Sequence, residues 1–289
     1  MTTDYSYEDT SRFAATSVGK IHYHVAGDGP PLLLLHGSGP GVSGWANFRG
    51  NLGAFAEHFT TYVVDLPGFG ASEVPREGHP VMVAPGAVNE LLDVLGIERV
   101  SIVGNSMGGG VGATFGIEHP DRLQRLVTLG GVGVNIFSPS PPEGIKLLVE
   151  FMERPSRETM VAWLDSMVFD PSIITDDLIE MRLATATEPG NLEWARKMYN
   201  RAGLNMMRTM ATNPPGPPAW AQLYKLKAPT LITWGRDDRV TPLDWALVPM
   251  RIIPKCELHV FYDCGHWAMI ERKDEFEATV LSFLLRDRL

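Results

Sequence analysis

Val100-Ser101-Ile102-Val103-Gly104-Asn105-Ser106-Met107-Gly108-Gly109 is the stretch of sequence that decides the fold. Its first four residues are apolar and rich in β-branched side chains, which predicts a short buried strand. From Gly109 to Glu118 the spacing is helical, with glycines that allow close packing on a sheet. The G-x-S-x-G pentad between them predicts a sharp turn that raises the Ser106 hydroxyl above the sheet. The Met107 N–H then lies at the positive end of the helix.

Strand-like segments recur along the whole chain with helical stretches between them. This alternation predicts an α/β fold with a mostly parallel central sheet. The expected strands are Ile21–Val25, Leu32–Leu35, Tyr62–Asp65, Val100–Val103, Leu126–Leu129, Thr230–Trp234 and Glu257–Tyr262.

One interval breaks this rhythm, because about 100 residues separate Leu129 from Thr230 where a strand–helix–strand unit needs roughly 30. We expect residues 1–134 and 223–289 to form the core and residues 135–222 to form a helical cap over the carboxyl edge of the sheet. Proline clusters at residues 138–142 and 213–218 bound this insertion. The expected cap helices are Glu143–Arg154, Ser156–Phe169, Thr175–Ala186 and Leu192–Met210.

Composition excludes several classes of protein. The 289 residues are 44% hydrophobic and 20% charged, as in ordinary globular enzymes. A net charge of −9 argues against a nucleic-acid partner, and no apolar run approaches the 18 residues of a membrane helix. The polar N-terminus lacks the features of a signal peptide, so cytoplasmic residence is expected. Cys256 and Cys264 flank a strand that would hold them about 26 Å apart, which predicts free thiols.

An acid and a histidine follow Ser106 in the chain order of serine hydrolases. Asp237 comes after the expected strand ending at Trp234, and His266 comes after the strand ending at Tyr262. Since the carboxyl ends of parallel strands open onto one crevice, we expect Ser106, Asp237 and His266 to meet there. A base must activate the serine hydroxyl, and a carboxylate must orient the histidine. Asp238 competes for the acid role, but we favour Asp237.

An oxyanion hole is the other requirement of such chemistry. The Met107 N–H is one expected donor, and the second is expected from the glycine loop His36–Gly41, at Ser38 or Gly39. This loop is neither a phosphate-binding loop nor a dinucleotide fingerprint. His22 and His24 could share one side of a strand, but no cluster of carboxylates or cysteines accompanies them. We therefore expect no cofactor and no metal.

At this point the chain resembles the meta-cleavage product hydrolases, carbon–carbon bond hydrolases of the α/β-hydrolase fold, from about residue 20 to the end. The resemblance is most specific at the Asn before Ser106 and the Trp after His266. It rests on His36–Gly41, Gly44–Phe48, Asp65–Gly70, Gly104–Gly109, Phe169–Thr175, Trp234–Arg239 and Cys264–Ala268.

The resemblance implies cleavage of 2-hydroxy-6-oxohexa-2,4-dienoates, the ring-opened products of catechol-type aromatics. Ketonisation would precede hydrolysis of the C5–C6 bond, giving 2-hydroxypenta-2,4-dienoate and a carboxylic acid. Arg182, Asn47 and Asn105 would hold the substrate carboxylate end, with Trp267 nearby, and the protein would form a homo-dimer or homo-tetramer. Arg182 has no acidic neighbour at helical spacing, which suits an anion-binding role.

Two other functions remain open from the sequence. A carboxylesterase would use the same Ser-His-Asp residues on C–O bonds. A non-catalytic receptor on the same fold would not need these three residues, yet the chain retains them. The arginine of the insertion and the Asn105–Trp267 pair favour the carbon–carbon hydrolase.

Overall fold

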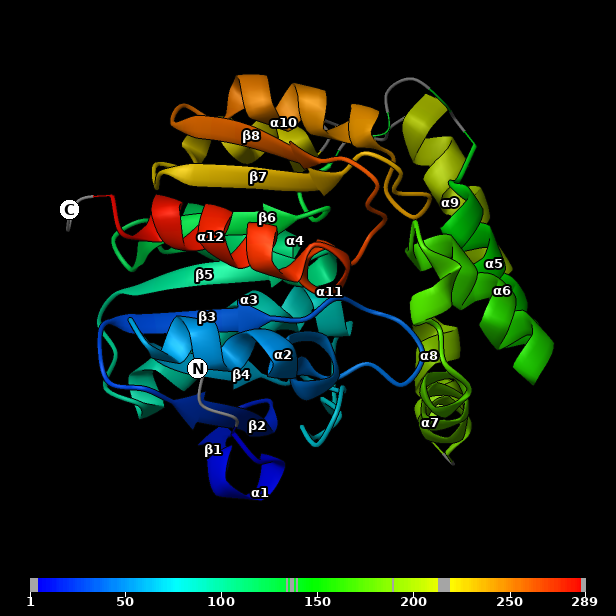
Figure 1. Ribbon diagram of the computed structural model, residues 1–289, viewed down its shortest axis with the longest axis horizontal. Helices are drawn as coiled ribbons and strands as arrows, with labels where there is room; N and C mark the ends of the chain where they lie inside the picture. Colours follow the sequence, from blue (N-terminus) through cyan, green and yellow to red (C-terminus); the bar gives the residue numbers. More distant parts are fainter. Residues whose placement is uncertain are drawn as a thin grey trace.

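A twisted eight-stranded sheet with helices on both faces forms the body of the protein (Figure 1). The computed structural model describes residues 5–286, except residues 134, 136, 137, 139, 189 and 213–218. The strands are β1 Ser11–Thr16, β2 Gly19–Ala26, β3 Pro31–Leu35, β4 Thr60–Val64, β5 Val100–Asn105, β6 Leu123–Leu129, β7 Thr230–Gly235 and β8 Cys256–Phe261. Their order across the sheet is β1-β2-β4-β3-β5-β6-β7-β8.

All seven expected strands are present, and the prediction of a mostly parallel sheet is confirmed. The strands from β4 to β8 in the sheet order pair in parallel, whereas β1–β2 and β2–β4 pair antiparallel. The sequence did not predict β1. This edge strand has no regular apolar alternation, and its Phe13 side chain is largely exposed.

Some helices cover the two faces of the sheet, and others lie beyond the ends of its strands (Figure 1). The helices are α1 Tyr7–Thr10, α2 Gly44–Ala56, α3 Pro80–Val94, α4 Met107–Glu118, α5 Glu143–Glu153, α6 Arg157–Met167, α7 Asp176–Thr187, α8 Asn191–Met198, α9 Arg201–Thr212, α10 Leu247–Ile252, α11 Ala268–Glu271 and α12 Lys273–Leu284, with 3-10 turns η1 Pro171–Ile173, η2 Ala219–Lys225 and η3 Leu243–Ala246. Among the described residues, no helix has both the length and the apolarity needed to cross a membrane.

Strand β3 shows why both faces of the sheet are apolar. Leu32 and Leu34 pack in the cluster that includes the α2 residue Phe55, while Leu33 and Leu35 pack in the cluster on the opposite face. All four leucines are fully buried. Since successive side chains of a strand point to opposite faces, a strand covered on both sides reads as a continuous apolar run.

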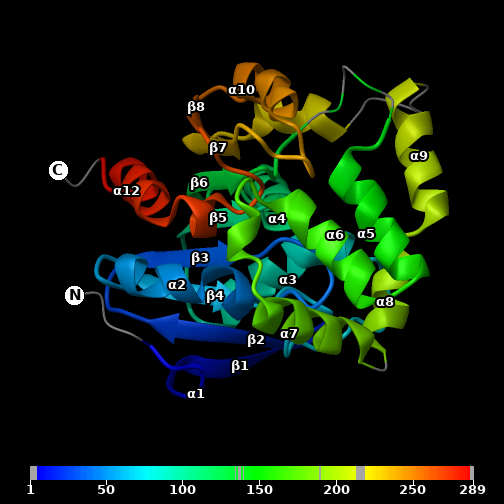
Figure 2. The same ribbon diagram turned by 45° about the vertical axis from the view of Figure 1, so that its right-hand side comes forward.

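Helices α5–α9 gather beyond the carboxyl ends of the parallel strands (Figures 1 and 2). They belong to the same packed body, because Met160 and Trp163 of α6 join the hydrophobic cluster that contains α2 and α12. The proline cluster at residues 213–218 and Pro139 of the other cluster lie outside the described residues.

The prediction of a single helix over Leu192–Met210 was wrong, because the structure contains two helices there. Helix α8 ends at Met198, and Tyr199 has an extended backbone with φ −120° and ψ 101°. The Asn200 side chain then accepts a hydrogen bond from the Gly203 N–H at 2.9 Å. This side-chain cap starts α9 separately, as Asn commonly does at helix N-termini.

Candidate active site

Ser106 occupies a strained turn between β5 and α4. Its φ of 49° and ψ of −115° are unusual for a residue other than glycine. The turn is possible because a Cβ on Gly104 would lie 2.4 Å from the Gly108 backbone, and one on Gly108 would lie 2.2 Å from the Leu35 carbonyl oxygen. The two glycines of the pentad therefore let α4 start directly against β5 and β3.

Asp238, and not the predicted Asp237, orients His266. The Asp238 Oδ2 atom lies 2.7 Å from the His266 Nδ1 atom, and both side chains are almost completely buried. The Oδ1 atom of Asp238 accepts the N–H groups of Val240 and Thr241, each at 2.8 Å, and the Thr241 hydroxyl donates to Oδ2 at 2.9 Å. These donors fix the carboxylate in one orientation, with its free position facing the imidazole.

The preference for Asp237 was wrong because the chain turns between the two acids. The Asp237 N–H donates to the Cys264 carbonyl at 2.9 Å, which extends the pairing of β7 with the chain after β8. The Asp237 side chain is about one-third exposed and forms an ion pair with Arg236 at 3.2 Å. Because of this turn, Asp237 faces outward toward Arg236, whereas Asp238 is buried and faces His266.

Ser106 and His266 both lie beside the chain at the end of β6. The Ser106 N–H donates to the Leu129 carbonyl at 2.7 Å, and a Cβ on the next residue, Gly130, would lie 3.1 Å from the His266 Cε1 atom. Among the described residues, the Ser106 hydroxyl makes no hydrogen bond to the imidazole. Hydrogen bonds between catalytic groups are often long without substrate and tighten only when it binds.

The glycine loop after β3 passes directly beside Ser106. A Cβ on Gly37 would lie 3.2 Å from the Ser106 Cβ, and Gly39 has a φ of 137° with its α-carbon packed against the Trp163 ring. The Ser38 hydroxyl accepts a hydrogen bond from Tyr199, and burial raises the pKa of Tyr199 to about 12. No sequence pattern indicated a role for Tyr199, because the contact spans 161 residues. The loop therefore places Ser38 and Gly39 near Ser106.

His36 has a structural role in this loop. Its Nδ1–H donates to the Gly37 carbonyl at 2.5 Å, and its Nε2 accepts the Leu66 N–H at 2.9 Å. Burial lowers the pKa of His36, so the neutral ring that both bonds require is favoured. The histidine thus ties the glycine loop to the end of β4.

Arg182 is a fully buried cation that lines the same small cavity as His266. Its Nη1 donates to the Pro40 carbonyl at 3.3 Å, while its Nε–H has no hydrogen-bond partner in the part of the chain that the structure describes. The guanidinium carbon lies 5.5 Å from the centre of the Trp267 ring. Burial, followed by the nearby charge of Arg49, lowers the pKa of Arg182 to about 10. A buried, charged arginine without a carboxylate partner is costly unless an anionic ligand completes its environment.

Asn47 and Asn105 form a pair next to this cation. The Asn47 Nδ2 donates to the Asn105 Oδ1 at 3.0 Å, and the Asn105 Nδ2 contacts the carbonyls of Leu129 and His266, both at 3.4 Å. A single small cavity is lined by Asn47, Asn105, Arg182 and Trp267 together with Ser38 and His266. The structure thus brings all four predicted substrate-binding residues to the histidine.

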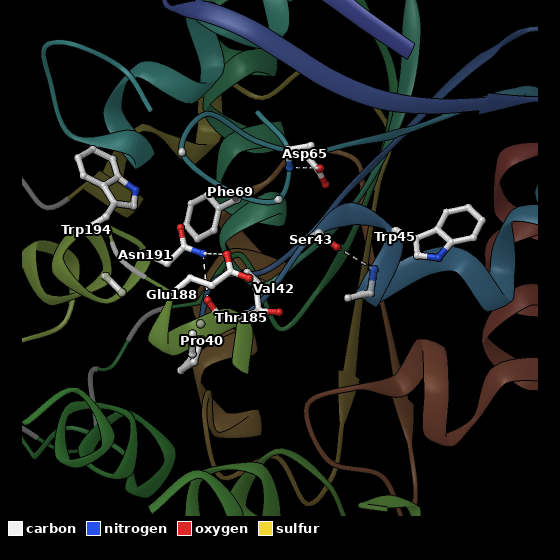
Figure 3. Close-up of a pocket in the computed structure, with 18 of the residues that line it drawn as sticks. Pro40, Val42, Ser43, Trp45, Asp65, Phe69, Thr185, Glu188, Asn191 and Trp194 are labelled. Atoms are coloured by element: carbon white, nitrogen blue, oxygen red, sulfur yellow. Dashed lines mark hydrogen bonds between the residues drawn. The ribbon is translucent and has the colours of Figure 1, made fainter. Parts of the chain in front are cut away.

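A larger cleft of about 350 Å³ lies on the other side of the glycine loop. Figure 3 shows Pro40 and Val42 of the loop, Phe69, and Trp194 of α8 around it. Two acidic side chains, Asp65 and Glu188, also line this cleft. Arg49 lines it as well, so this cleft is largely apolar with charges of both signs.

His22 belongs to a buried structural network near β2. Its Nδ1–H donates to the Asp65 Oδ2 atom at 2.8 Å, and its Nε2 atom is hydrogen-bonded to the Ser11 hydroxyl at 2.8 Å. No group of three histidine, cysteine or acidic side chains suited to a metal occurs among the described residues. Cys256 and Cys264 are free, as predicted.

The comparisons with known proteins agree with this geometry. The chain matches the α/β-hydrolase fold family over residues 30–273. It is 38% identical to the 2-hydroxy-6-oxo-6-phenylhexa-2,4-dienoate hydrolase of Burkholderia cepacia, over 98% of this chain and 99% of the relative. It is also 38% identical to the 2-hydroxy-6-oxononadienedioate/2-hydroxy-6-oxononatrienedioate hydrolase of Comamonas testosteroni, over 92% of this chain and 91% of the relative.

Solved structures give the same result. The meta-cleavage product hydrolase of Pseudomonas fluorescens IP01 superposes with a TM-score of 0.87 at 30% identity, covering 97% of this chain and 99% of that one. The 2-hydroxy-6-oxo-6-phenylhexa-2,4-dienoate hydrolase of Rhodococcus sp. strain RHA1 superposes with a TM-score of 0.83 at 30% identity, covering 94% and 96%. The chain therefore belongs to the meta-cleavage product hydrolases, serine-dependent enzymes of the α/β-hydrolase fold.

Proposed function

We propose that the protein hydrolyses the C5–C6 bond of 2-hydroxy-6-oxohexa-2,4-dienoates, releasing 2-hydroxypenta-2,4-dienoate and a carboxylic acid. The observation that carries this proposal is the buried Arg182 guanidinium, which lacks an acidic partner and shares a cavity with His266. An ester of a neutral alcohol and acid would leave that charge unmatched. A dienoate carboxylate matches it with a charge-assisted hydrogen bond.

The proposed catalytic residues are Ser106, His266 and Asp238. The Asp238 carboxylate accepts a hydrogen bond from the His266 Nδ1–H, so the Nε2 atom carries no proton. Nε2 can therefore act as a base toward Ser106 or toward a water molecule that Ser106 orients. Asp238 also stabilises the imidazolium that forms. After ketonisation, which protonates C5, the base-activated oxygen adds to the C6 carbonyl carbon. Cleavage then passes the C5–C6 electron pair to the dienoate fragment, and water supplies the hydroxyl of the carboxylic acid.

Backbone amides are proposed to stabilise the oxyanion formed at C6. The Met107 N–H lies at the N-terminus of α4, where the helix dipole favours negative charge. The second amide is proposed to be that of Ser38 or Gly39, supported by the passage of the glycine loop beside Ser106. Asn47, Asn105 and Trp267 are proposed to position the carboxylate end of the substrate on Arg182.

The organisation around this site is also proposed. Residues 1–134 and 223–289 are assigned to the core and residues 135–222 to the cap, which is supported by the position of α5–α9 beyond the strand ends (Figure 2). The free cysteines suit a reducing cytoplasm.

A homo-dimer or homo-tetramer is supported by the edge strand β8, where the side chains of Val260 and, just after the strand, Tyr262 are exposed. Sedimentation of the purified protein tests this assembly.

Replacing Ser106 by Ala tests the catalytic proposal. Ser106→Ala should cleave a yellow 6-phenyl dienoate at least about 10³-fold more slowly than the wild type, because the activated hydroxyl is lost. It should still bind the substrate and shift its visible spectrum, since Arg182 and the asparagines are intact. Wild-type turnover by this variant would remove Ser106 from the mechanism.

Replacing Arg182 by Ala tests the substrate class. Arg182→Ala should lower kcat/KM for the dienoate by about 10²- to 10³-fold, as expected for a lost charge-assisted contact. A neutral nitrophenyl ester should be much less affected. Arg154→Ala is the matched control, since Arg154 is an exposed arginine of the same helical layer. Equal losses on both substrates would favour a carboxylesterase.

A further inference from the structure

A second cleft shares a wall with the catalytic cavity. It has a volume of about 320 Å³ and lies between α2, α7 and the junction of α11 with α12. Asn47, Arg182 and Trp267 line this cleft, and the same three side chains line the cavity that contains His266. The buried guanidinium of Arg182 thus stands between an open cleft and the catalytic residues.

The charges along this cleft are all positive. Arg49, Arg182 and Lys273 line it, and none of its lining residues is acidic, although the chain has a net charge of −9. Arg49 is exposed and makes no ion pair within the part of the chain that the structure describes, whereas Lys273 is paired with Glu277 at 2.9 Å. Arg49 also contributes to the lowered pKa of Arg182, so its field reaches the buried cation.

We propose that this cleft is the entrance through which the carboxylate of the substrate reaches Arg182, and that Arg49 is the first cation it meets. The nature of the anion rests on the proposed function. Positive potential along a cleft with low-dielectric walls raises the rate at which an anion is captured. Passage then transfers the carboxylate from Arg49 to Arg182 as the shared wall opens.

The cleft of Figure 3 is less suited to this task. Arg49 lines it too, but there it lies beside the carboxylates of Asp65 and Glu188, which repel an anion, and neither Arg182 nor His266 lines this cleft. By contrast, the proposed entrance ends at the side chains that are expected to bind the substrate carboxylate. Both the positive lining and the shared wall with the His266 cavity therefore favour the cleft between α2 and α7 as the entrance.

A substitution that fills the cleft tests the route. A Cβ on Gly50, a helical residue lining the cleft, would have only the Lys273 Cε atom nearby, at 3.9 Å. Gly50→Trp should therefore fold normally and lower kcat/KM for the dienoate at least about tenfold. Gly86→Trp is the matched control, because Gly86 is an exposed helical glycine with no atom within 4 Å of its Cβ position. If thermal unfolding shows both variants folded and Gly50→Trp keeps wild-type kcat/KM, the route lies elsewhere.

A charge reversal tests the role of Arg49 without requiring cleavage. Sorbate (2,4-hexadienoate) has the dienoate carboxylate but no C6 ketone, so its binding can be followed by stopped-flow tryptophan fluorescence. Arg49→Glu should slow association about tenfold at 10 mM salt, and the difference should vanish near 0.5 M salt. Arg99→Glu, which makes the same change of charge just before β5, should behave like the wild type.

The outcomes separate this inference from the proposed function. An equal effect of Arg99→Glu, an effect of Arg49→Glu that salt does not reduce, or no sorbate binding by the wild type would each overturn the entrance. Failure of the wild type to cleave any dienoate would overturn the proposed function instead. The sorbate measurement would still decide whether Arg49 guides a carboxylate into the cleft.

Discussion

Replacing Asp238 by Asn, compared with Asp237 by Asn, tests the assignment of the acid. The N–H groups of Val240 and Thr241 both point at the Asp238 Oδ1 atom, so an Asn must keep its oxygen there. Its amide nitrogen then takes the place of Oδ2, 2.7 Å from the His266 Nδ1 atom. An amide N–H directed at Nδ1 forces that atom to accept, which moves the imidazole proton to Nε2.

The consequence is a histidine that can no longer act as a base toward Ser106. In serine hydrolases this change of tautomer lowers kcat about 10⁴-fold, which corresponds to about 5.4 kcal/mol of activation free energy. Asp237→Asn loses only a partly exposed ion pair with Arg236 and should change kcat by less than about threefold.

Both variants should be assayed by the loss of dienoate colour, with circular dichroism and thermal unfolding to show that each is folded. We expect kcat to fall by several orders of magnitude in Asp238→Asn and to stay near the wild-type value in Asp237→Asn. The reasoning is refuted if folded Asp237→Asn loses more activity than Asp238→Asn.

Two further predictions concern stability. Gly108→Ala places a Cβ 2.2 Å from the Leu35 carbonyl oxygen, so urea unfolding should show a loss of at least about 3 kcal/mol. Gly110→Ala, whose Cβ would have its nearest contact at 3.6 Å, should instead be neutral or gain about 0.5–1 kcal/mol from helix propensity, and equal losses would contradict this view of the turn. The pKa of His24 is lowered to about 4, first by burial and then by the charge of His22, so between pH 6.5 and 4 the unfolded chain holds a proton that the folded chain does not. Stability should therefore fall by on the order of 2 kcal/mol as pH decreases from 6.5 to 4, and His24→Gln should remove that part of the slope; an unchanged slope in the variant would show that His24 is not responsible.

Local patterns predicted the parts of the site that depend on nearby residues. The strand, turn and helix around Ser106 could be predicted from ten consecutive residues. The apolar run forms the strand, and the glycines beside Ser106 allow the sharp turn into the helix. The positions of Ser106 after β5 and His266 after β8 also predicted that both would lie at one edge of the sheet, since parallel strands bring their carboxyl ends together there.

The remaining parts depend on contacts between distant segments. The choice between Asp237 and Asp238 is set by a turn whose direction depends on pairing with Cys264, 27 residues later. The bond from Tyr199 to Ser38 and the split between α8 and α9 likewise have no pattern in the sequence. Sequence spacing showed that Arg182 has no acidic residue three or four positions away on its helix. Only the packed structure shows that its Nε–H is buried without a hydrogen-bond partner among the described residues.

The most direct test of the account is the wild-type rate on a yellow 6-phenyl dienoate beside a neutral nitrophenyl ester, with the products identified by chromatography. We expect rapid loss of colour, equal amounts of 2-hydroxypenta-2,4-dienoate and benzoate, and a far lower kcat/KM for the ester. Persistent colour across dienoates with phenyl and alkyl groups at C6, together with rapid ester hydrolysis, would contradict it.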